Sequence, residues 1–76
     1  MTPLFYIRKK LFDVSQSAFG EIAGTTQATV CRWEKEELEP SRAEMTNIRA
    51  EAIRRGISWN DRLFFEAPTP TTEGGS

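Results

Sequence analysis

The chain has 76 residues, enough for one small domain with a thin hydrophobic core. It contains no histidine and a single cysteine, Cys31, so the composition excludes the usual zinc ligand sets and a disulfide framework, and we expect no metal and no cofactor. Ten lysines and arginines against eleven acidic residues give a net charge of -1, which by itself does not indicate a nucleic-acid partner. No apolar run approaches the ~20 residues that span a bilayer, and a lone cysteine suits a reducing compartment, so we expect a cytoplasmic protein.

The N-terminal part of the sequence predicts two short helices. Thr2 followed by Pro3 is a typical helix start, and the apolar residues that follow form a helical stripe, which predicts a helix over about residues 3–12. Ser15 can cap a second helix whose apolar positions recur every three to four residues. Gly24 ends that helix, because glycine tolerates the left-handed backbone found at helix C-termini.

Two further helices are predicted in the middle of the chain. Thr25–Thr26 offers an N-cap for a third helix of about three turns, which precedes the polar stretch that ends in Pro40. Ser41 stands three residues before Glu44, the spacing of a capping box. A fourth helix follows and ends at Gly56. Its apolar stripe is formed by Met45, Ile48, Ala52 and Ile53.

The C-terminal part predicts one more short element. Ser58 and Asp61 repeat the spacing of a capped helix start ahead of an apolar cluster, so a fifth helix is expected, although Phe64–Phe65 equally suits an extended edge. The sequence from residue 66 onward is rich in Pro, Gly, Ser and Thr, which predicts a disordered tail over residues 66–76. The sequence therefore predicts a compact all-α domain of four to five helices over residues 1–65.

The segment from Gln16 to Lys35 has the pattern of a helix-turn-helix. A two-turn helix, a glycine turn and a longer helix pack at a steep angle, which requires small and apolar residues on the inner faces. At about 100° per residue, Val30 and Trp33 of the third helix face inward. The outer side of that helix then carries Gln27, Ala28, Cys31, Arg32 and Lys35.

This outer side has the chemistry for base contacts in the major groove of DNA. Gln27 can bind adenine through two hydrogen bonds, Arg32 can bind guanine in the same way, and Ala28 can contact a thymine methyl group. Gln16 and the neighbouring amides at the start of the second helix can hold a phosphate, because helix N-termini attract anions. Cys31 fits better as a small residue facing DNA than as a redox switch.

The segment SQSAFGEIAGTTQATVCRWEKEELEPS carries a resemblance that covers about residues 4–57. It is similar to the Cro/CI, or XRE, class of lambda-repressor-like domains. The shared pattern is Ser-Gln at the head of the second helix, Gly in the turn, Thr before the third helix, and Arg-Trp-Glu and Pro-Ser before the fourth. In this chain the pattern is met by Ser15-Gln16, Gly24, Thr26, Arg32-Trp33-Glu34 and Pro40-Ser41.

The resemblance implies a lambda-repressor-like domain that binds a pseudo-palindromic operator in double-stranded DNA as a dimer. It implies base contacts from Gln27, Ala28, Cys31 and Arg32, and phosphate contacts from Gln16, Thr26 and Arg42. It also implies that Glu34 pairs with a basic residue of the first helix, either Arg8 or Lys9. Lys35, on the outer side of the third helix, is a further candidate for a phosphate contact.

The chain departs from the family pattern in several places. Gly20 stands where the family prefers Ala, and since Gly in a helix interior costs ~1 kcal/mol relative to Ala, the sequence predicts that Gly20→Ala is stabilising. Asp13 and Glu36 stand where the family often has Gly, so two helix exits form without the residue preferred there. The segment Leu11–Val14 is one residue longer than usual. Three glutamates within residues 36–39 lie close to the expected DNA backbone and predict weak non-specific binding.

The aromatic C-terminal segment bears on the oligomeric state. Trp59, Leu63, Phe64 and Phe65 are many apolar residues for a segment outside the main core. We expect Trp59 and Leu63 to pack on the first helix and part of Phe64–Phe65 to be available to a partner. The homodimer that the resemblance implies then has Trp59, Phe64 and Phe65 as its candidate contacts.

Two functions from different classes follow from the sequence. The first is a sequence-specific transcriptional regulator, a dimeric repressor of phage or mobile-element type whose third helix enters the major groove. The alternative is a protein-interaction module, such as an antitoxin-like subunit with weak or secondary DNA binding, which the near-neutral charge and the aromatic C-terminal segment favour. We expect no enzyme, because the sequence has no catalytic constellation.

Overall fold

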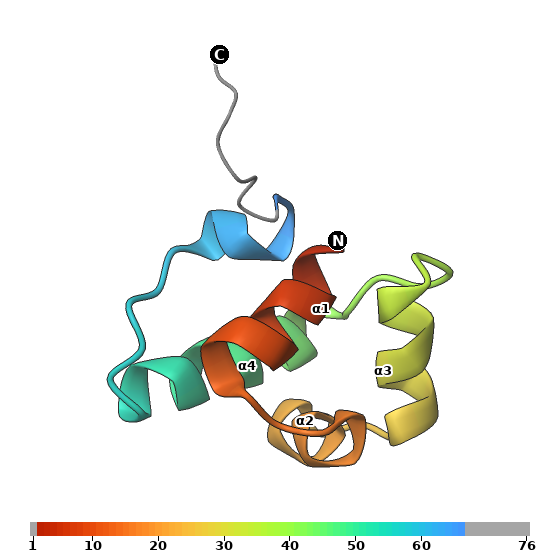
Figure 1. Ribbon diagram of the computed structural model, residues 1–76, viewed down its shortest axis with the longest axis horizontal. Coiled ribbons are helices and arrows are strands. Elements are labelled where there is room, and N and C mark those ends of the chain that lie inside the picture. The colour runs from red at the N-terminus through yellow and green to blue at the C-terminus, as the bar shows by residue number, and fades with distance from the viewer. Residues whose placement is uncertain (1, 67–76) are drawn as a thin grey trace.

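The computed structural model describes residues 2–66, and all regular secondary structure in that range is helical (Figure 1). The elements in chain order are α1 (Pro3–Tyr6), the π-helix η1 (Ile7–Phe12), α2 (Gln16–Ala23), α3 (Gln27–Glu34), α4 (Arg42–Arg54) and the 3-10 helix η2 (Asp61–Phe64). The expected all-α class is confirmed. The expected tail lies outside the described residues except for Glu66. No helix within residues 2–66 has the length and apolar character needed to cross a membrane.

The first helix runs from Pro3 to Phe12, as the sequence predicts, but its second half is wider than an α-helix. The Thr2 hydroxyl caps its start by accepting a hydrogen bond from the Phe5 amide at 3.3 Å. From Ile7 onward the turns are π-helical, and the Asp13 amide donates to the carbonyl of Arg8, five residues back. A π-helical turn of this kind holds more residues than an α-helical turn. Asp13 itself has a left-handed backbone with φ of 55°.

The two central helices begin at the predicted caps. The Ser15 hydroxyl accepts from the Ala18 amide at 3.1 Å, and the Thr26 hydroxyl accepts from the Thr29 amide at 3.2 Å. α2 ends at Gly24, whose φ is 83°. A three-residue turn, 24–26, then leads into α3, and the two helices pack against each other.

The third helix is shorter than the sequence predicts. It has eight residues, which is about two turns rather than three. The chain leaves the helix at Glu36, which has a left-handed backbone with φ of 62°. The amides of Glu36 and Glu37 donate to the carbonyls of Trp33 and Arg32 at 3.1 and 2.9 Å, the pattern of a Schellman motif. The position that usually holds glycine in this motif is therefore occupied by a glutamate.

The fourth helix has the predicted capping box and the predicted glycine exit. The Glu44 amide donates to the Ser41 hydroxyl at 3.1 Å, and the Ser41 amide donates to the Glu44 carboxylate at 2.8 Å. Ile48 and Ala52 are fully buried. The prediction that Ile53 belongs to the same apolar stripe is wrong. Ile53 lies about 100° around the helix from the buried Ala52 and is 63% exposed.

The C-terminal segment folds back on the first helix. The predicted helix at Ser58 is replaced by the 3-10 helix η2, whose start is capped by Asn60: its side chain accepts from the Arg62 amide at 2.9 Å. Phe64 is only 8% exposed and stacks edge-on against Trp59 with ring centroids 5.1 Å apart. The extended-edge alternative is wrong. Of the pair Phe64–Phe65, part of which was expected to be available to a partner, Phe64 is buried in its own chain. Phe65 is 70% exposed.

Phe19 of α2 forms the centre of the core. It is fully buried and packs edge-on against Phe12 and Trp33, with centroid distances of 5.5 and 6.2 Å. These three rings join the first helix, α2 and α3. The other buried apolar residues are Leu4, Ile7, Ala23, Val30, Ile48, Ala52 and Phe64.

Gly20 lies where α2 approaches the turn before α3. A Cβ atom on Gly20 would stand 3.0 Å from the carbonyl carbon of Thr26 and 3.1 Å from the carbonyl oxygens of Thr25 and Thr26. These atoms belong to the backbone, which cannot rotate away. The expectation that alanine stabilises this position considered helix propensity alone, and this close contact opposes it.

Candidate nucleic-acid interface

The third helix has a buried side and an exposed side. Val30 is fully buried and Trp33 is 2% exposed, and both anchor α3 on the core. The residues predicted for the outer side are exposed except for Cys31, which is half-buried: Gln27, Ala28, Arg32 and Lys35. α3 lies at one edge of the molecule (Figure 1), so no other element of the described chain covers this side.

A buried ion pair fixes α3 to the first helix. The Arg8 Nε and Nη2 atoms donate to the two carboxylate oxygens of Glu34 at 2.5 and 3.2 Å. Both side chains are only 10% exposed, and Arg8 also donates to the carbonyl of Val14 at 3.0 Å. Of the two partners expected for Glu34, the structure selects Arg8, whereas Lys9 is exposed.

The ion pair is extended to the exposed side of α3 by two glutamines. Gln16 Nε2 donates to Glu34 Oε1 at 3.0 Å, and Gln27 Nε2 donates to Gln16 Oε1 at 3.4 Å. Gln16 comes from the start of α2 and Gln27 from the start of α3. The amide of Gln27 is thus oriented by a chain of hydrogen bonds that begins at Arg8. The sequence did not predict the bond from Gln16 to Glu34, because the two residues are 18 positions apart and share no local pattern.

Arg32 has an acidic neighbour that the sequence did not assign to it. Its Nε lies 3.7 Å from a carboxylate oxygen of Glu37, and the two side chains are 61% and 54% exposed. The pair forms because the left-handed exit at Glu36 turns the chain back along α3. A signal was available in the sequence, since Glu37 follows Arg32 by five residues and lies next to the helix exit.

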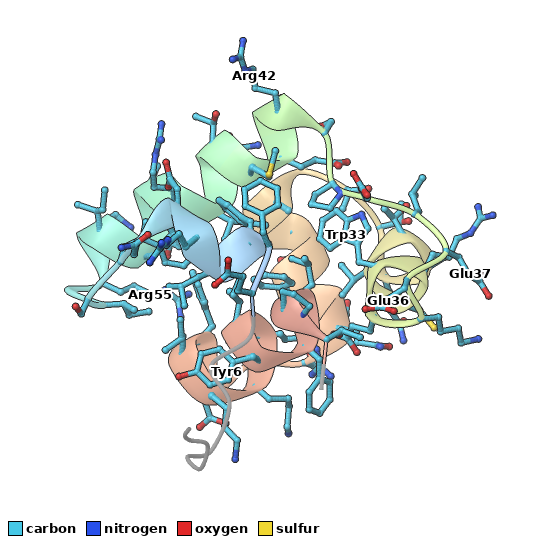
Figure 2. All side chains as sticks on the ribbon, turned by 90° about the horizontal axis from the view of Figure 1, so that it is seen from above. Tyr6, Trp33, Glu36, Glu37, Arg42 and Arg55 are labelled. Atoms are coloured by element: carbon cyan, nitrogen blue, oxygen red, sulfur yellow. The ribbon has the colours of Figure 1, made fainter. Side chains whose placement is uncertain are left out.

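The predicted phosphate-binding residues are not gathered at one place. Gln16 and Thr26 lie at the starts of α2 and α3, and the Thr26 hydroxyl also contacts the Thr29 hydroxyl at 3.1 Å. Lys35 is exposed at the end of α3. Arg42 is exposed at the start of α4, and Figure 2 shows it extending from a different edge than Glu37. The structure therefore brings Gln16, Thr26 and α3 together and leaves Arg42 apart.

The two arginines at the end of α4 share one acid of the same helix. Arg54 and Arg55 both donate to the carboxylate of Glu51, the second at 2.7 Å. These bonds, first from Arg54 and then from Arg55, lower the pKa of Glu51 from 4.5 to about 2. Arg49 pairs with Asp61 of η2 at 3.2 Å. These three arginines share two acids, so the cluster has a net charge of only +1 and adds little positive potential to the α3 side.

The described chain offers no evident metal centre, since residues 2–66 contain no group of three acidic, cysteine or histidine side chains placed to hold an ion. The chemistry of the candidate interface is therefore that of hydrogen-bonding and cationic side chains on a rigid helix. Comparisons with protein-family models, with curated proteins and with solved structures found no match to this chain.

Proposed function

We propose that the chain is a sequence-specific double-stranded DNA-binding protein in which α2, the turn 24–26 and α3 act as a helix-turn-helix. The observation that carries the proposal is the exposed outer side of α3. It presents Gln27, Ala28 and Arg32 on a helix that is capped at its start and held by the core on its other side. The resemblance to the Cro/CI class, drawn from the same residues, supports it.

The proposed base contacts follow from the chemistry of each side chain. Gln27 forms two hydrogen bonds with adenine, and its hydrogen bond to Gln16 limits the rotamers that it must give up on binding. Arg32 binds the O6 and N7 atoms of guanine. Ala28 contacts a thymine methyl group, and Cys31 is small enough to allow close approach. Each well-formed bidentate contact contributes about 1–3 kcal/mol of discrimination between bases.

The proposed phosphate contacts come from Gln16, Thr26, Lys35 and Arg42. Gln16 donates one hydrogen of its amide to Glu34 and keeps a second for a phosphate oxygen. If all four residues of one subunit contact phosphates and the two cationic ones displace counterions, log K falls with log salt by about 2 per subunit. Glu36, Glu37 and Glu39 stand beyond the end of α3 and disfavour binding that depends on the DNA backbone alone.

A homodimer on a pseudo-palindromic operator completes the proposal, and occupation of the operator makes the protein a transcriptional repressor. Of the residues predicted for the dimer contact, Phe64 is buried in its own chain and Trp59 is half-buried against it. Phe65 is 70% exposed and is the residue that supports this interface best. A binder of near-neutral charge benefits from two linked half-site contacts, because each half-site alone is weak.

The proposal is tested by selecting bound sites from random DNA duplexes. The wild-type chain is expected to enrich one short sequence, and Arg32→Ala is expected to lose preference at one base pair with about 10-fold weaker binding. Arg54→Ala is the matched control, because it removes the same charge at the far end of α4. An unchanged preference in Arg32→Ala, or no enrichment by the wild type, would overturn the proposal.

A second candidate function, a protein-interaction module, is favoured by one observation. Leu38 and Phe65, both large and apolar, are 43% and 70% exposed and line the same groove. Scattered apolar residues on a surface are ordinary, but exposed ones that line a common groove favour an interaction site.

A further inference from the structure

The groove lies between the start of α1, the end of α3, the linker 35–41, the first turn of α4 and the end of η2. Its volume is about 380 Å³. Most of its lining is apolar and comes from Leu4, Leu38, Pro40, Met45, Phe64 and Phe65. In Figure 2, Trp33 lies between the linker and the centre of the molecule, and Glu36 lies farther from the centre on the same side. The groove is separate from the outer side of α3 that the proposed DNA contact uses.

Trp33 lines this groove and carries an unsatisfied polar atom. Its ring lines the groove, and its indole Nε1 is buried and has no hydrogen-bond partner within residues 2–66. An unpaired buried N–H group costs about 1–3 kcal/mol, and such groups are rare in folded proteins. An acceptor that enters the groove and reaches this buried atom after a small shift of the surrounding side chains would remove this cost. The groove therefore favours an occupant that carries a carbonyl oxygen among apolar groups.

The charge of the residues that line the groove further restricts the chemical class of its occupant. Glu36 and Glu39 are both exposed and both line it, and no basic residue does. A cationic occupant gains from both carboxylates, and an anionic one is repelled. The sequence after Phe65 contains Glu66 and Glu73 and no lysine or arginine, so its charge does not suit the groove.

We infer that this groove binds an extended apolar segment of a partner protein that carries a lysine or arginine. A backbone carbonyl of the segment accepts the hydrogen bond from Trp33 Nε1, its apolar side chains pack between Leu38 and Phe65, and its cation meets Glu36 and Glu39. Aromatic-lined grooves of this kind suit proline-rich segments, which lose little conformational entropy on binding because they are already extended. The inference does not depend on the proposed DNA binding.

The test selects ligands from a displayed library of random decapeptides on the immobilised full chain. We expect the enriched peptides to combine apolar residues or proline with one lysine or arginine. Synthetic copies of the best peptide are then titrated by fluorescence anisotropy. Exchange of the basic residue of that peptide for glutamate is expected to weaken binding at least 10-fold.

Variants of the chain test separately the contact with Glu36 and Glu39 and the contact with Trp33. Glu36→Gln/Glu39→Gln is expected to weaken binding about 10-fold and to abolish its salt dependence. Asp13→Asn/Glu21→Gln is the matched control, because it removes two exposed carboxylates that do not line the groove. Trp33→Phe keeps an aromatic ring and removes the N–H donor, and we expect a fivefold or greater loss of peptide binding with the circular dichroism spectrum unchanged.

Several results would overturn the inference. One is a library that yields no basic apolar peptide, and another is binding that none of these variants weakens. Peptide binding that appears only after removal of residues 67–76 would assign the groove to the chain itself. A dimer that dissociates in the Glu36→Gln/Glu39→Gln variant would assign it to a second copy.

Discussion

The guanidinium of Arg8 and the carboxylate of Glu34 face each other across the interior of the domain, joined by two hydrogen bonds although 26 residues separate them in sequence. Each side chain is 10% exposed. This pair sets the position of α3 relative to the first helix, and through Gln16 it orients Gln27 on the exposed side. Stability and the proposed DNA contact therefore share one set of side chains.

Removal of one partner of this pair is expected to cost about 3–5 kcal/mol, because it leaves the other charge buried without a counter-charge. We expect Arg8→Met and Glu34→Leu each to lower the free energy of unfolding by that amount in urea denaturation. The double variant is expected to recover most of the loss, since it removes both charges. A double variant as unstable as the sum of the single ones would contradict this account of the pair.

Glu37→Gln is expected to strengthen DNA binding severalfold with little effect on stability. The exposed pair of Glu37 with Arg32 contributes at most about 1 kcal/mol to folding. The Glu37 carboxylate, however, repels DNA phosphates and competes with the DNA for the Arg32 guanidinium. Mobility shifts against a selected duplex measure the affinity. Glu21→Gln, on the exposed side of α2, is the control for the loss of one negative charge. Equal gains in the two variants would show that Glu37 has no specific effect on Arg32.

Glu36→Gly is expected to raise the free energy of unfolding by about 1 kcal/mol. A side chain in the left-handed conformation costs about 1–2 kcal/mol, and the greater backbone freedom of unfolded glycine offsets part of the gain. Lys35→Gly is the matched control, because Lys35 has a right-handed backbone with φ of -91°. Lys35→Gly is expected to lower the free energy of unfolding by about 0.5–1 kcal/mol. Thermal unfolding of both variants measures these changes in stability. A loss of stability in both variants would contradict a left-handed exit at Glu36.

Gly20→Ala is expected to destabilise the chain by about 1 kcal/mol. Overpacking against a backbone costs about 1–3 kcal/mol, which exceeds the ~1 kcal/mol that alanine gains in helix propensity. Ser17→Ala, at an exposed position of the same helix, is the control and is expected to be stabilising by about 0.5 kcal/mol. A higher melting temperature for Gly20→Ala would mean that the turn 24–26 relaxes easily.

Glu51 predicts a dependence of stability on acid pH. Its pKa in the folded chain is about 2, below the ordinary 4.5, because Arg54 and then Arg55 hydrogen-bond the ionised carboxylate. The stabilisation is fully present above pH 4.5 and is lost as the pH falls towards 2. We expect Glu51→Gln to reduce the difference in stability between neutral and acid solution. NMR titration of the Glu51 side chain measures the pKa directly, and a value near 4.5 would exclude the proposed cause.

The helix starts could be predicted because their signals are local. Ser15, Thr26 and Ser41 cap α2, α3 and α4 through hydroxyl groups that accept from amides three residues later. Such a bond is visible in a window of four residues. The alternation of buried and exposed residues along α3 is local in the same sense, because it follows from helix geometry once the core residue Trp33 is identified.

The features that the sequence did not predict depend on tertiary contacts. No local signal marks the exit from α3 at Glu36, a residue with no preference for the left-handed conformation that it adopts; only the resemblance to the Cro/CI class indicated a helix exit there. The sequence predicts that Trp59 and Leu63 pack on the first helix, but no local pattern indicates that Phe64 is buried with them. At the candidate interface, the exposed residues of α3 followed from periodicity. The bond from Gln16 to Glu34 did not, since it joins two helices.

The π-helical half of the first helix gives the chain a tolerance to changes in length. A wide turn holds one residue more than an α-helical turn, and here it lies between an ordinary α-helical start and the left-handed exit at Asp13. Deletion of an exposed residue of that half, such as Lys10, would convert the wide turn into a regular one without moving either end. A protein of this fold with a first helix one residue shorter can therefore present the same partner to Glu34.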